Sequence, residues 1–250
     1  MADIIEIDHL SHTFSDGSLG LRDIQLGIKK GSFVVLAGCN GSGKTTLIRH
    51  LNGLLLPTEG EVRIEGIPVA TNLTHARQKV GMVFQDTDSQ IVGETVFEDI
   101  AFGPENLKLD RDEINRRVTT ALDLVGLSTR AEDRPHLLSG GQKRRLTIAG
   151  ILAMEPAILV FDEPFSNLDF PGIISVLQHI VSLHKQGNTI LLTTHDLEKV
   201  IAHADRLLIM DNGRIVRDDR PQELFKDLES FGVRQPCASR MGGEVSSWLE

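Results

Sequence analysis

Residues 33–45 read FVVLAGCNGSGKT, the part of the sequence that is most informative about the fold. Its first five residues are an apolar run flanked by glycines, as is typical of a buried strand in a parallel sheet. Residues 38–45 match the pattern G-x-x-x-x-G-K-[ST], and a helical pattern follows from Lys44 to about Leu54. The glycines let the backbone fold around phosphates, while the helix N-terminus adds a partial positive charge. The stretch therefore predicts a phosphate-binding loop between a strand and a helix.

Three side chains of this loop carry specific expectations. Lys44 would neutralise the β and γ phosphates of a nucleotide, and Thr45 would bind Mg²⁺. Cys39 lies inside the loop, close to the expected helix N-terminus. Either its thiol lies near the phosphates, so that alkylation of the thiol would block the site, or Cys39 is a small buried residue.

A second motif, ILVFDE at residues 158–163, reads as a buried strand that ends in two carboxylates. The carboxyl ends of parallel strands are the edge where open α/β sheets bind ligands. Asp162 can hold Mg²⁺ through water, and Glu163 can act as a general base on an attacking water molecule. The alternative is a pair of solvated acids at the start of a loop.

A third motif, LSGGQ at residues 138–142, opens a helical pattern that runs from Gly140 to Met154. Ser139 is a good N-cap, and the glycines leave the first helix N–H groups open to an anion. Taken alone, the segment could be a structural turn. Together with the phosphate loop and the carboxylate strand, in this order, it is not a chance match.

The pattern between the motifs indicates an α/β protein. The first 30 residues alternate as antiparallel strands around a turn at 15–17, and residues 80–84 and 189–193 read as further buried strands. Asp211-Asn212-Gly213 predicts a hairpin. From residue 86 to about 156 the pattern is mostly helical. These alternations predict a parallel α/β core with an antiparallel β subdomain and an inserted helical subdomain.

Composition narrows the class of protein. Of 250 residues, 40% are hydrophobic, as in ordinary globular proteins, and the net charge of −9 disfavours a nucleic-acid surface. Two distant cysteines fit a reducing compartment. Residues 1–6 lack the features of a signal peptide, and the longest apolar stretch, 148–161, is too short to span a bilayer. We expect a chain that crosses no membrane itself.

The three motifs, over roughly residues 3–230, resemble the ATP-binding cassette family. The resemblance implies a P-loop NTPase fold with a RecA-like parallel core, and a magnesium-dependent ATPase. It implies a nucleotide-binding domain at residues 1–232, with a helical subdomain at about 86–157, and a C-terminal tail at 233–250. In the tail, Trp248 is either an exposed docking anchor or part of a loosely packed or disordered end.

The resemblance also assigns roles to single residues. Phe14 sits where the family places an aromatic ring on adenine, more often tyrosine, of which this chain has none; alternatively it is a core aromatic residue. Gln85 matches the glutamine that reaches Mg²⁺ and the attacking water, or is an ordinary loop amide. His195 matches the histidine that contacts the γ-phosphate, or is structural. Residues 166–169 match the loop across the dimer interface, or form an N-cap before Pro171.

The resemblance implies three sets of site residues. Nucleotide would be bound by Phe14, Gly38, Asn40, Gly41, Ser42, Gly43, Lys44, Thr45, Thr46, Ser139, Gly140, Gly141 and Gln142. Glu163, His195 and Gln85 would be catalytic. Thr45, Gln85 and Asp162 would bind Mg²⁺.

The family implies a head-to-tail dimer, formed with an identical chain or a paralogous ATPase. Each ATP would lie between the phosphate loop of one protomer and residues 139–141 of the other. The chain would sit on the cytoplasmic face of the membrane, with integral membrane subunits docking near Gln85–Phe102. The apolar residues of that segment would line a docking groove, pack the subdomain core, or do some of each; they are Ile91, Val92, Val96 and Phe97.

Residues 88–107, DSQIVGETVFEDIAFGPENL, resemble more narrowly the ATPases of energy-coupling factor importers for cobalt, nickel or vitamins. The alternative for this segment is a generic turn with Pro104 at a helix start. Other functions remain open: the ATPase of another importer or exporter, a soluble ATPase of DNA repair or translation, or a regulatory subunit without hydrolysis. A single cassette without heptad repeats disfavours a soluble ATPase of DNA repair or translation. The presence of Gln85, Glu163 and His195 disfavours a regulatory subunit without hydrolysis.

Overall fold

The computed structural model describes residues 3–249. Met1, Ala2 and Glu250, on which parts of the signal-peptide and tail predictions fall, lie outside the described residues. Two sheets organise the fold: a four-stranded sheet in the order β2-β1-β4-β5, and a six-stranded sheet in the order β10-β9-β3-β8-β7-β6. The first is antiparallel, and the second is parallel except for the β9–β10 pair. The predicted fold class is confirmed.

The strands are β1 (Asp3–Thr13), β2 (Leu19–Lys29), β3 (Phe33–Ala37), β4 (Glu59–Ile64), β5 (Ile67–Pro68), β6 (Val80–Val83), β7 (Ile158–Asp162), β8 (Thr189–Thr194), β9 (Arg206–Asp211) and β10 (Arg214–Asp219). The α-helices are α1 (Lys44–Leu51), α2 (Leu73–Lys79), α3 (Val96–Asn106), α4 (Arg111–Val125), α5 (Gly140–Leu152), α6 (Phe170–Lys185), α7 (Pro221–Leu224) and α8 (Cys237–Arg240).

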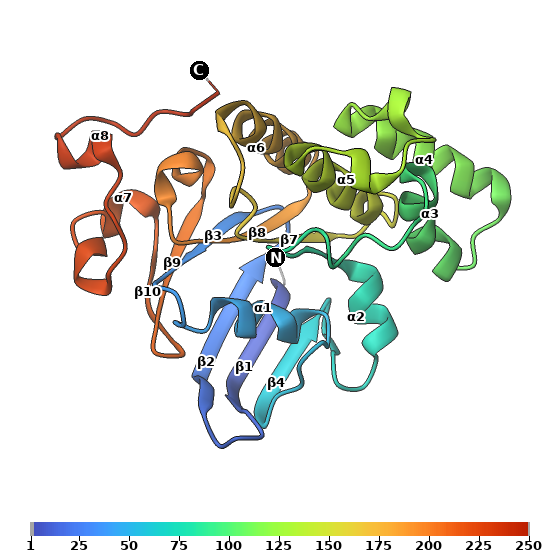
Figure 1. Ribbon diagram of the computed structural model, residues 1–250. Coiled ribbons are helices and arrows are strands. Elements are labelled where there is room, and N and C mark those ends of the chain that lie inside the picture. The colour runs from blue at the N-terminus through green and yellow to red at the C-terminus, as the bar shows by residue number, and fades with distance from the viewer. Residues whose placement is uncertain (1–2, 250) are drawn as a thin grey trace.

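The six-stranded sheet separates two hydrophobic cores. Strand β3 lies at its centre, and every residue of the strand is buried. Because side chains alternate along a strand, Phe33 and Val35 pack into the core on the side of α5 and α6. Val34 and Leu36 pack into the opposite core, against β1, β2 and α1 (Figure 1). This double burial explains the continuous apolar run that the sequence shows before the phosphate loop.

Helices α3, α4 and α5 pack against one another at one end of the molecule, between β6 and β7 in the chain (Figure 1). A capping box between Thr95 and Glu98 starts α3, and the Asp110 side chain caps α4. Pro104 lies inside α3, so the interpretation of this segment as a turn with Pro104 at a helix start is wrong. The capping box, nine residues earlier in the chain, fixes where the helix begins.

The C-terminal segment folds back along the core. Val233 is 1% exposed, and the Cys237 N–H donates to Glu198 Oε2 at 2.7 Å. The Trp248 ring packs on Phe170, with 5.8 Å between ring centroids. Trp248 is partly buried against the core, so it is not the fully exposed docking anchor that was one of the two interpretations.

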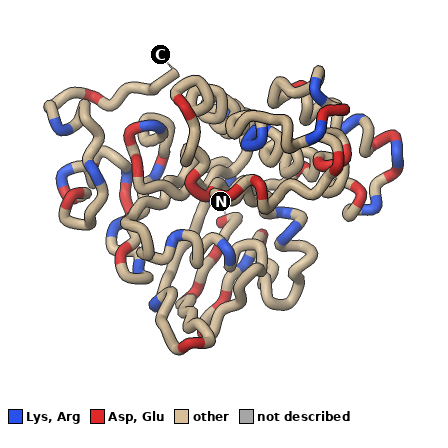
Figure 2. Tube along the Cα trace, in the orientation of Figure 1, with Lys and Arg blue, Asp and Glu red and all other residues tan. Residues whose placement is uncertain are grey.

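Charged residues of both signs are spread over all parts of the molecule seen in Figure 2, with Lys and Arg interspersed among Asp and Glu. Among residues 3–249, no helix combines the length and apolar character that crossing a bilayer requires.

Candidate nucleotide site

The phosphate loop joins β3 to α1 with open backbone N–H groups. Gly43 precedes the helix at φ 105°, and no side chain caps the helix N-terminus. A side chain at Gly38, where φ is 154°, would place Cβ 2.3 Å from the Met210 carbonyl oxygen. Only glycine therefore fits at this point, where the loop lies against the Met210 carbonyl oxygen of β9. The uncapped N–H groups and the helix dipole together favour an anion above the loop.

Lys44 is enclosed by this loop. Its Nζ donates to the carbonyl oxygens of Gly38 at 2.7 Å and Cys39 at 3.0 Å, and the residue is 6% exposed. Burial lowers the pKa of the Lys44 ammonium, and the nearby Glu163 and Asp162 carboxylates oppose that shift. The two acids thus help to keep a buried cation charged where phosphates would bind.

Asp162, at the end of β7, is positioned by two hydroxyl groups. Thr45 Oγ1 donates to it at 3.0 Å and Thr193 Oγ1 at 2.6 Å. The Thr45 hydroxyl and an Asp162 carboxylate oxygen are therefore neighbours, although 117 residues separate them in the chain. Hydroxyl and carboxylate oxygens are ligands that Mg²⁺ accepts, so this donor pair fits a magnesium ion.

Glu163 is held by β8 and the loop that follows it. Its N–H donates to the Thr193 carbonyl oxygen, and its Oε1 accepts from His195 Nδ1 at 2.9 Å. Glu163 has φ 48°, a backbone region that non-glycine residues rarely adopt, and is 9% exposed. Strained backbone held by surrounding contacts is common at functional sites. Glu163 contacts His195, and Asp162 is buried and accepts two hydroxyl hydrogen bonds, so the interpretation of the two as free, solvated acids is wrong.

One pocket of about 380 Å³ brings most of the predicted site together. Its walls come from the β1–β2 turn, the phosphate loop, the end of β7, the loop after β6 and the β9–β10 turn. The predicted residues among its lining are Phe14, Asn40, Gly41, Gly43, Lys44, Thr45, Thr46, Gln85 and Glu163. Phe14 is 38% exposed at this pocket, so it is not a core residue.

The LSGGQ motif lies elsewhere. A capping box between Ser139 and Gln142 starts α5, as the sequence predicts for Ser139. The motif lines a second pocket, of about 520 Å³, together with residues 167–169. The Asp169 side chain also caps α6, so its N-cap interpretation is correct. Within one chain, the structure keeps this motif apart from the phosphate loop.

Arg144 is a residue of interest to which the sequence analysis gives no role. It is 3% exposed, and it donates to the carbonyl oxygens of Phe84 at 2.5 Å and Gln85 at 2.8 Å. Burial lowers the pKa of the guanidinium. The hydrogen bonds of Arg144 to the Phe84 and Gln85 carbonyl oxygens tie α5 to the loop that carries Gln85. The sequence does contain a signal that Arg144 is buried, because position 144 lies on the same helix face as Ile148, four residues later, which is buried.

Cys39 is exposed, so its interpretation as a small buried residue is wrong. Its thiol lies 3.5 Å from the Phe231 carbonyl oxygen and 3.4 Å from that of Gly232. We expect N-ethylmaleimide to inactivate ATP hydrolysis and bound ATP to slow the inactivation, because an adduct would occupy the phosphate loop. The Cys237→Ser protein isolates this thiol, and Cys39→Ala is the resistant control. Full activity after stoichiometric labelling of Cys39, measured by mass spectrometry, would contradict the expectation.

A phosphate loop facing strand-end carboxylates is the site of a P-loop nucleoside triphosphatase. The ABC transporter family model matches residues 21–166. Energy-coupling factor transporter ATP-binding protein EcfA1 of Caldanaerobacter subterraneus is 46% identical, over 98% of this chain and 92% of that protein. This chain belongs to the ABC transporter family, within which it is an ATP-binding subunit and an ATPase.

Two solved structures support this assignment. CbiO1 of Clostridium perfringens, part of the ABC transporter complex CbiONQ, superposes with a TM-score of 0.83 and 34% identity, over 97% of this chain and 98% of that chain. A dimeric ATP-binding cassette in a post-hydrolysis state, bound to ADP and Pi, superposes with a TM-score of 0.77 and 30% identity. The match covers 86% of this chain and 98% of that chain.

Proposed function

We propose that this chain is the ATP-hydrolysing subunit of an energy-coupling factor type importer, bound peripherally at the cytoplasmic face of a membrane. The observation that carries the catalytic part is the single pocket that holds Lys44, Thr45, Gln85 and Glu163. The importer type is supported by the likeness to EcfA1 and CbiO1. Neither relative is a soluble ATPase of DNA repair or translation, so that alternative is not favoured.

The residues around the phosphate loop would share the work of hydrolysis. Thr45, Asp162 and Gln85 would hold Mg²⁺, which when bound neutralises charge on the β and γ phosphates. Lys44 would bind the same phosphates through its ammonium. Glu163 would accept a proton from the attacking water, and the 2.9 Å contact with His195 orients its carboxylate.

The separation of the two pockets supports a dimer as the active unit. The N-terminus of α5 faces a pocket of its own, which no phosphate loop of the same chain lines. In a head-to-tail dimer, residues 139–141 would approach the γ-phosphate held by the partner subunit. ATP would then join two protomers of the same negative charge, and hydrolysis would let them separate.

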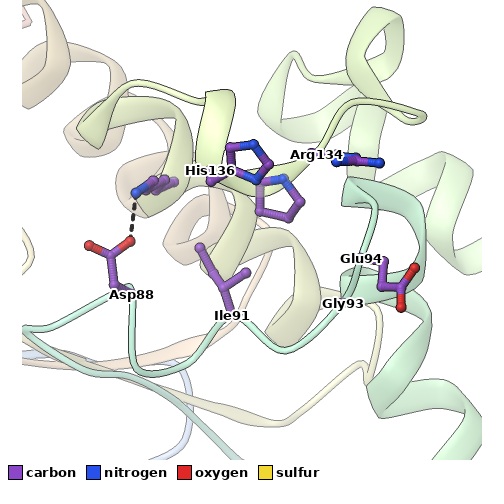
Figure 3. Close-up of a pocket in the computed structure, with 8 residues that line it drawn as sticks. Asp88, Ile91, Gly93, Glu94, Arg134 and His136 are labelled. Carbon is purple, nitrogen blue, oxygen red and sulfur yellow. Dashed lines mark hydrogen bonds and ion pairs between the residues drawn. The ribbon is translucent and has the colours of Figure 1, made fainter.

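A groove beside α5 is the proposed docking site for a membrane subunit. A pocket of about 500 Å³ is lined by Asp88, Ile91, Gly93, Glu94, Arg134, Pro135, His136 and Lys143. Ile91 and His136 lie between Asp88 on one side and Arg134 with Glu94 on the other (Figure 3). Next to the pocket, Val92 is 61% exposed, whereas Val96 is fully buried in the subdomain core. The apolar residues thus divide between groove and core.

The test is to tag the chain in its own cells, solubilise membranes in mild detergent and identify the copurifying proteins. A small scaffold membrane protein together with a separate substrate-binding membrane protein would support the proposal and reveal the cargo. Two large permease subunits with a surface binding protein would assign the chain to another importer. Soluble factors or nucleic acid alone would refute a transport role and leave the ATPase assignment intact.

We expect Val92→Asp to lose at least about 80% of the copurifying membrane protein, because a charge on a contact surface must be desolvated on docking. ATP hydrolysis by the purified soluble variant should stay within about twofold of the wild type, because Val92 lies outside the nucleotide pocket. The exposed Leu124→Asp substitution on α4 is the matched control. Unchanged copurification of Val92→Asp would refute docking at this groove.

A further inference from the structure

Two buried histidines lie next to Phe14. His12 on β1 is 8% exposed, and His50 on α1 is fully buried. His12 Nδ1 and His50 Nε2 are 3.2 Å apart, and the two ring centroids are 4.8 Å apart. They join β1, which leads to Phe14, to the helix that follows the phosphate loop.

One arrangement of protons satisfies this pair. His50 Nδ1 must donate to the Thr46 carbonyl oxygen, which lies 2.8 Å away and can only accept. His12 Nδ1 must likewise donate to the Leu56 carbonyl oxygen at 3.1 Å. The same His12 N–H can therefore be shared with His50 Nε2, which is left as an acceptor. His50, which donates through Nδ1 and accepts through Nε2, is a neutral ring in this arrangement, and burial lowers its pKa.

The His12 ring in turn contacts Phe14. The two ring centroids are 4.8 Å apart with an interplanar angle of 83°, an edge-to-face arrangement that aromatic pairs favour. Phe14 is also confined by Gly20, because a Cβ there would lie 2.7 Å from Phe14 Cε2 and 3.3 Å from Thr46 Cγ2. The ring that faces the nucleotide pocket is thus held between His12 and the Gly20 backbone.

We propose that His12 is a positioning residue for the nucleotide base: with His50 it fixes the ring of Phe14 and ties that ring to Thr46 on α1. The adenine subsite and the triphosphate subsite then keep a fixed separation. The inference rests on the proposed function, in which adenine stacks on Phe14. It adds that the stack is set from within the fold by an imidazole that does not touch the nucleotide.

The test compares ATP with inorganic tripolyphosphate, which has no base, as competitors of a fluorescent ATP analogue. In His12→Ala, we expect ATP affinity to fall about three- to tenfold, with the affinity for tripolyphosphate unchanged. In steady-state assays KM for ATP should rise by the same factor, with kcat within about twofold. General damage to the fold would weaken both ligands, so equal losses would overturn the proposal.

Two conservative variants separate the ring from the hydrogen bond. His12→Phe keeps an aromatic edge against Phe14 and should restore ATP affinity to within about twofold of the wild type. His12→Asn keeps a donor for the Leu56 carbonyl but lacks the ring, and it should bind ATP as weakly as His12→Ala. Restoration by asparagine but not by phenylalanine would overturn the assignment of the ring contact.

Gly20→Ala tests the same ring from its other side. The added methyl group must displace Phe14, so ATP affinity should fall while tripolyphosphate binding is kept. The exposed His9→Ala on β1 is the control.

Phe14→Ala should lose roughly tenfold in ATP affinity. If the wild type binds no ATP, the proposed function fails. If Phe14→Ala weakens ATP binding and His12→Ala does not, only this inference fails.

Discussion

Replacing Glu163 by glutamine is expected to lower kcat for ATP hydrolysis by at least about 100-fold while ATP binding is retained. The amide keeps the size of the side chain and can still contact His195, but it cannot accept a proton from water. The Lys44 ammonium and the phosphate loop are unchanged, so nucleotide is still held. Removal of one negative charge near the triphosphate should also tighten ATP binding, because the carboxylate repels phosphate oxygens.

The expected product is an ATP-bound dimer that does not open. Size-exclusion chromatography with ATP should show Glu163→Gln as a dimer, and with ADP as a monomer. Phosphate release under saturating ATP measures the loss of turnover. Glu132→Gln, which neutralises an exposed carboxylate, is the matched control and should hydrolyse ATP at the wild-type rate. Rapid turnover by Glu163→Gln would refute its assignment as the base.

Lys44→Ala is expected to weaken ATP binding by about 100-fold or more. The ammonium would make charge-assisted hydrogen bonds to two phosphates, each much stronger than a neutral one. Its position inside the loop also matters, because Nζ donates to the Gly38 and Cys39 carbonyl oxygens. Isothermal titration with ATP measures the effect.

Because Lys44 is buried, loss of binding could follow from a collapsed loop. Lys44→Met keeps most of the chain length and volume, so it separates loss of charge from loss of packing. We expect both variants to lose ATP affinity and Lys44→Met to keep the melting temperature within a few degrees. Lys79→Ala, which removes a surface ion pair with Glu65, is the control. Wild-type ATP affinity in Lys44→Met would refute the role of the charge.

The elements that the sequence predicted well are those whose causes are local. The antiparallel β1–β2 pair follows from alternation around a turn, and α5 begins at Gly140 because Ser139 before it and Gln142 form a capping box. One helix end was less accurate: α1 was predicted to about Leu54 and ends at Leu51. Gly53, at φ 69°, follows the C-cap Asn52, and the N–H groups of Gly53 and Leu54 donate to the His50 and Arg49 carbonyl oxygens, so a local glycine stop ends the helix earlier than predicted.

The candidate site likewise has parts that the sequence predicted and parts that it did not. The phosphate loop could be located from eight consecutive residues, because strand, glycine loop and helix are consecutive in the chain. The strand-end rule for parallel sheets placed Asp162 at the ligand-binding edge, and the structure adds its hydrogen bond with Thr45. The contact of Arg144 with the Phe84 and Gln85 carbonyls was not predicted, since it joins residues 60 and 59 positions apart in the chain.

The phosphate loop, the order of the motifs and the α/β class could all be predicted from the sequence, because backbone constraints over a few residues are enough to specify each of them. The contacts between side chains that are distant in the chain became known only from the folded structure. The contacts of His12 with His50, of Glu163 with His195 and of Phe170 with Trp248 join residues 32 to 78 positions apart in the chain. Such contacts depend on strand register and on the packing of both cores, to which many residues contribute at once, so no short stretch of sequence encodes them.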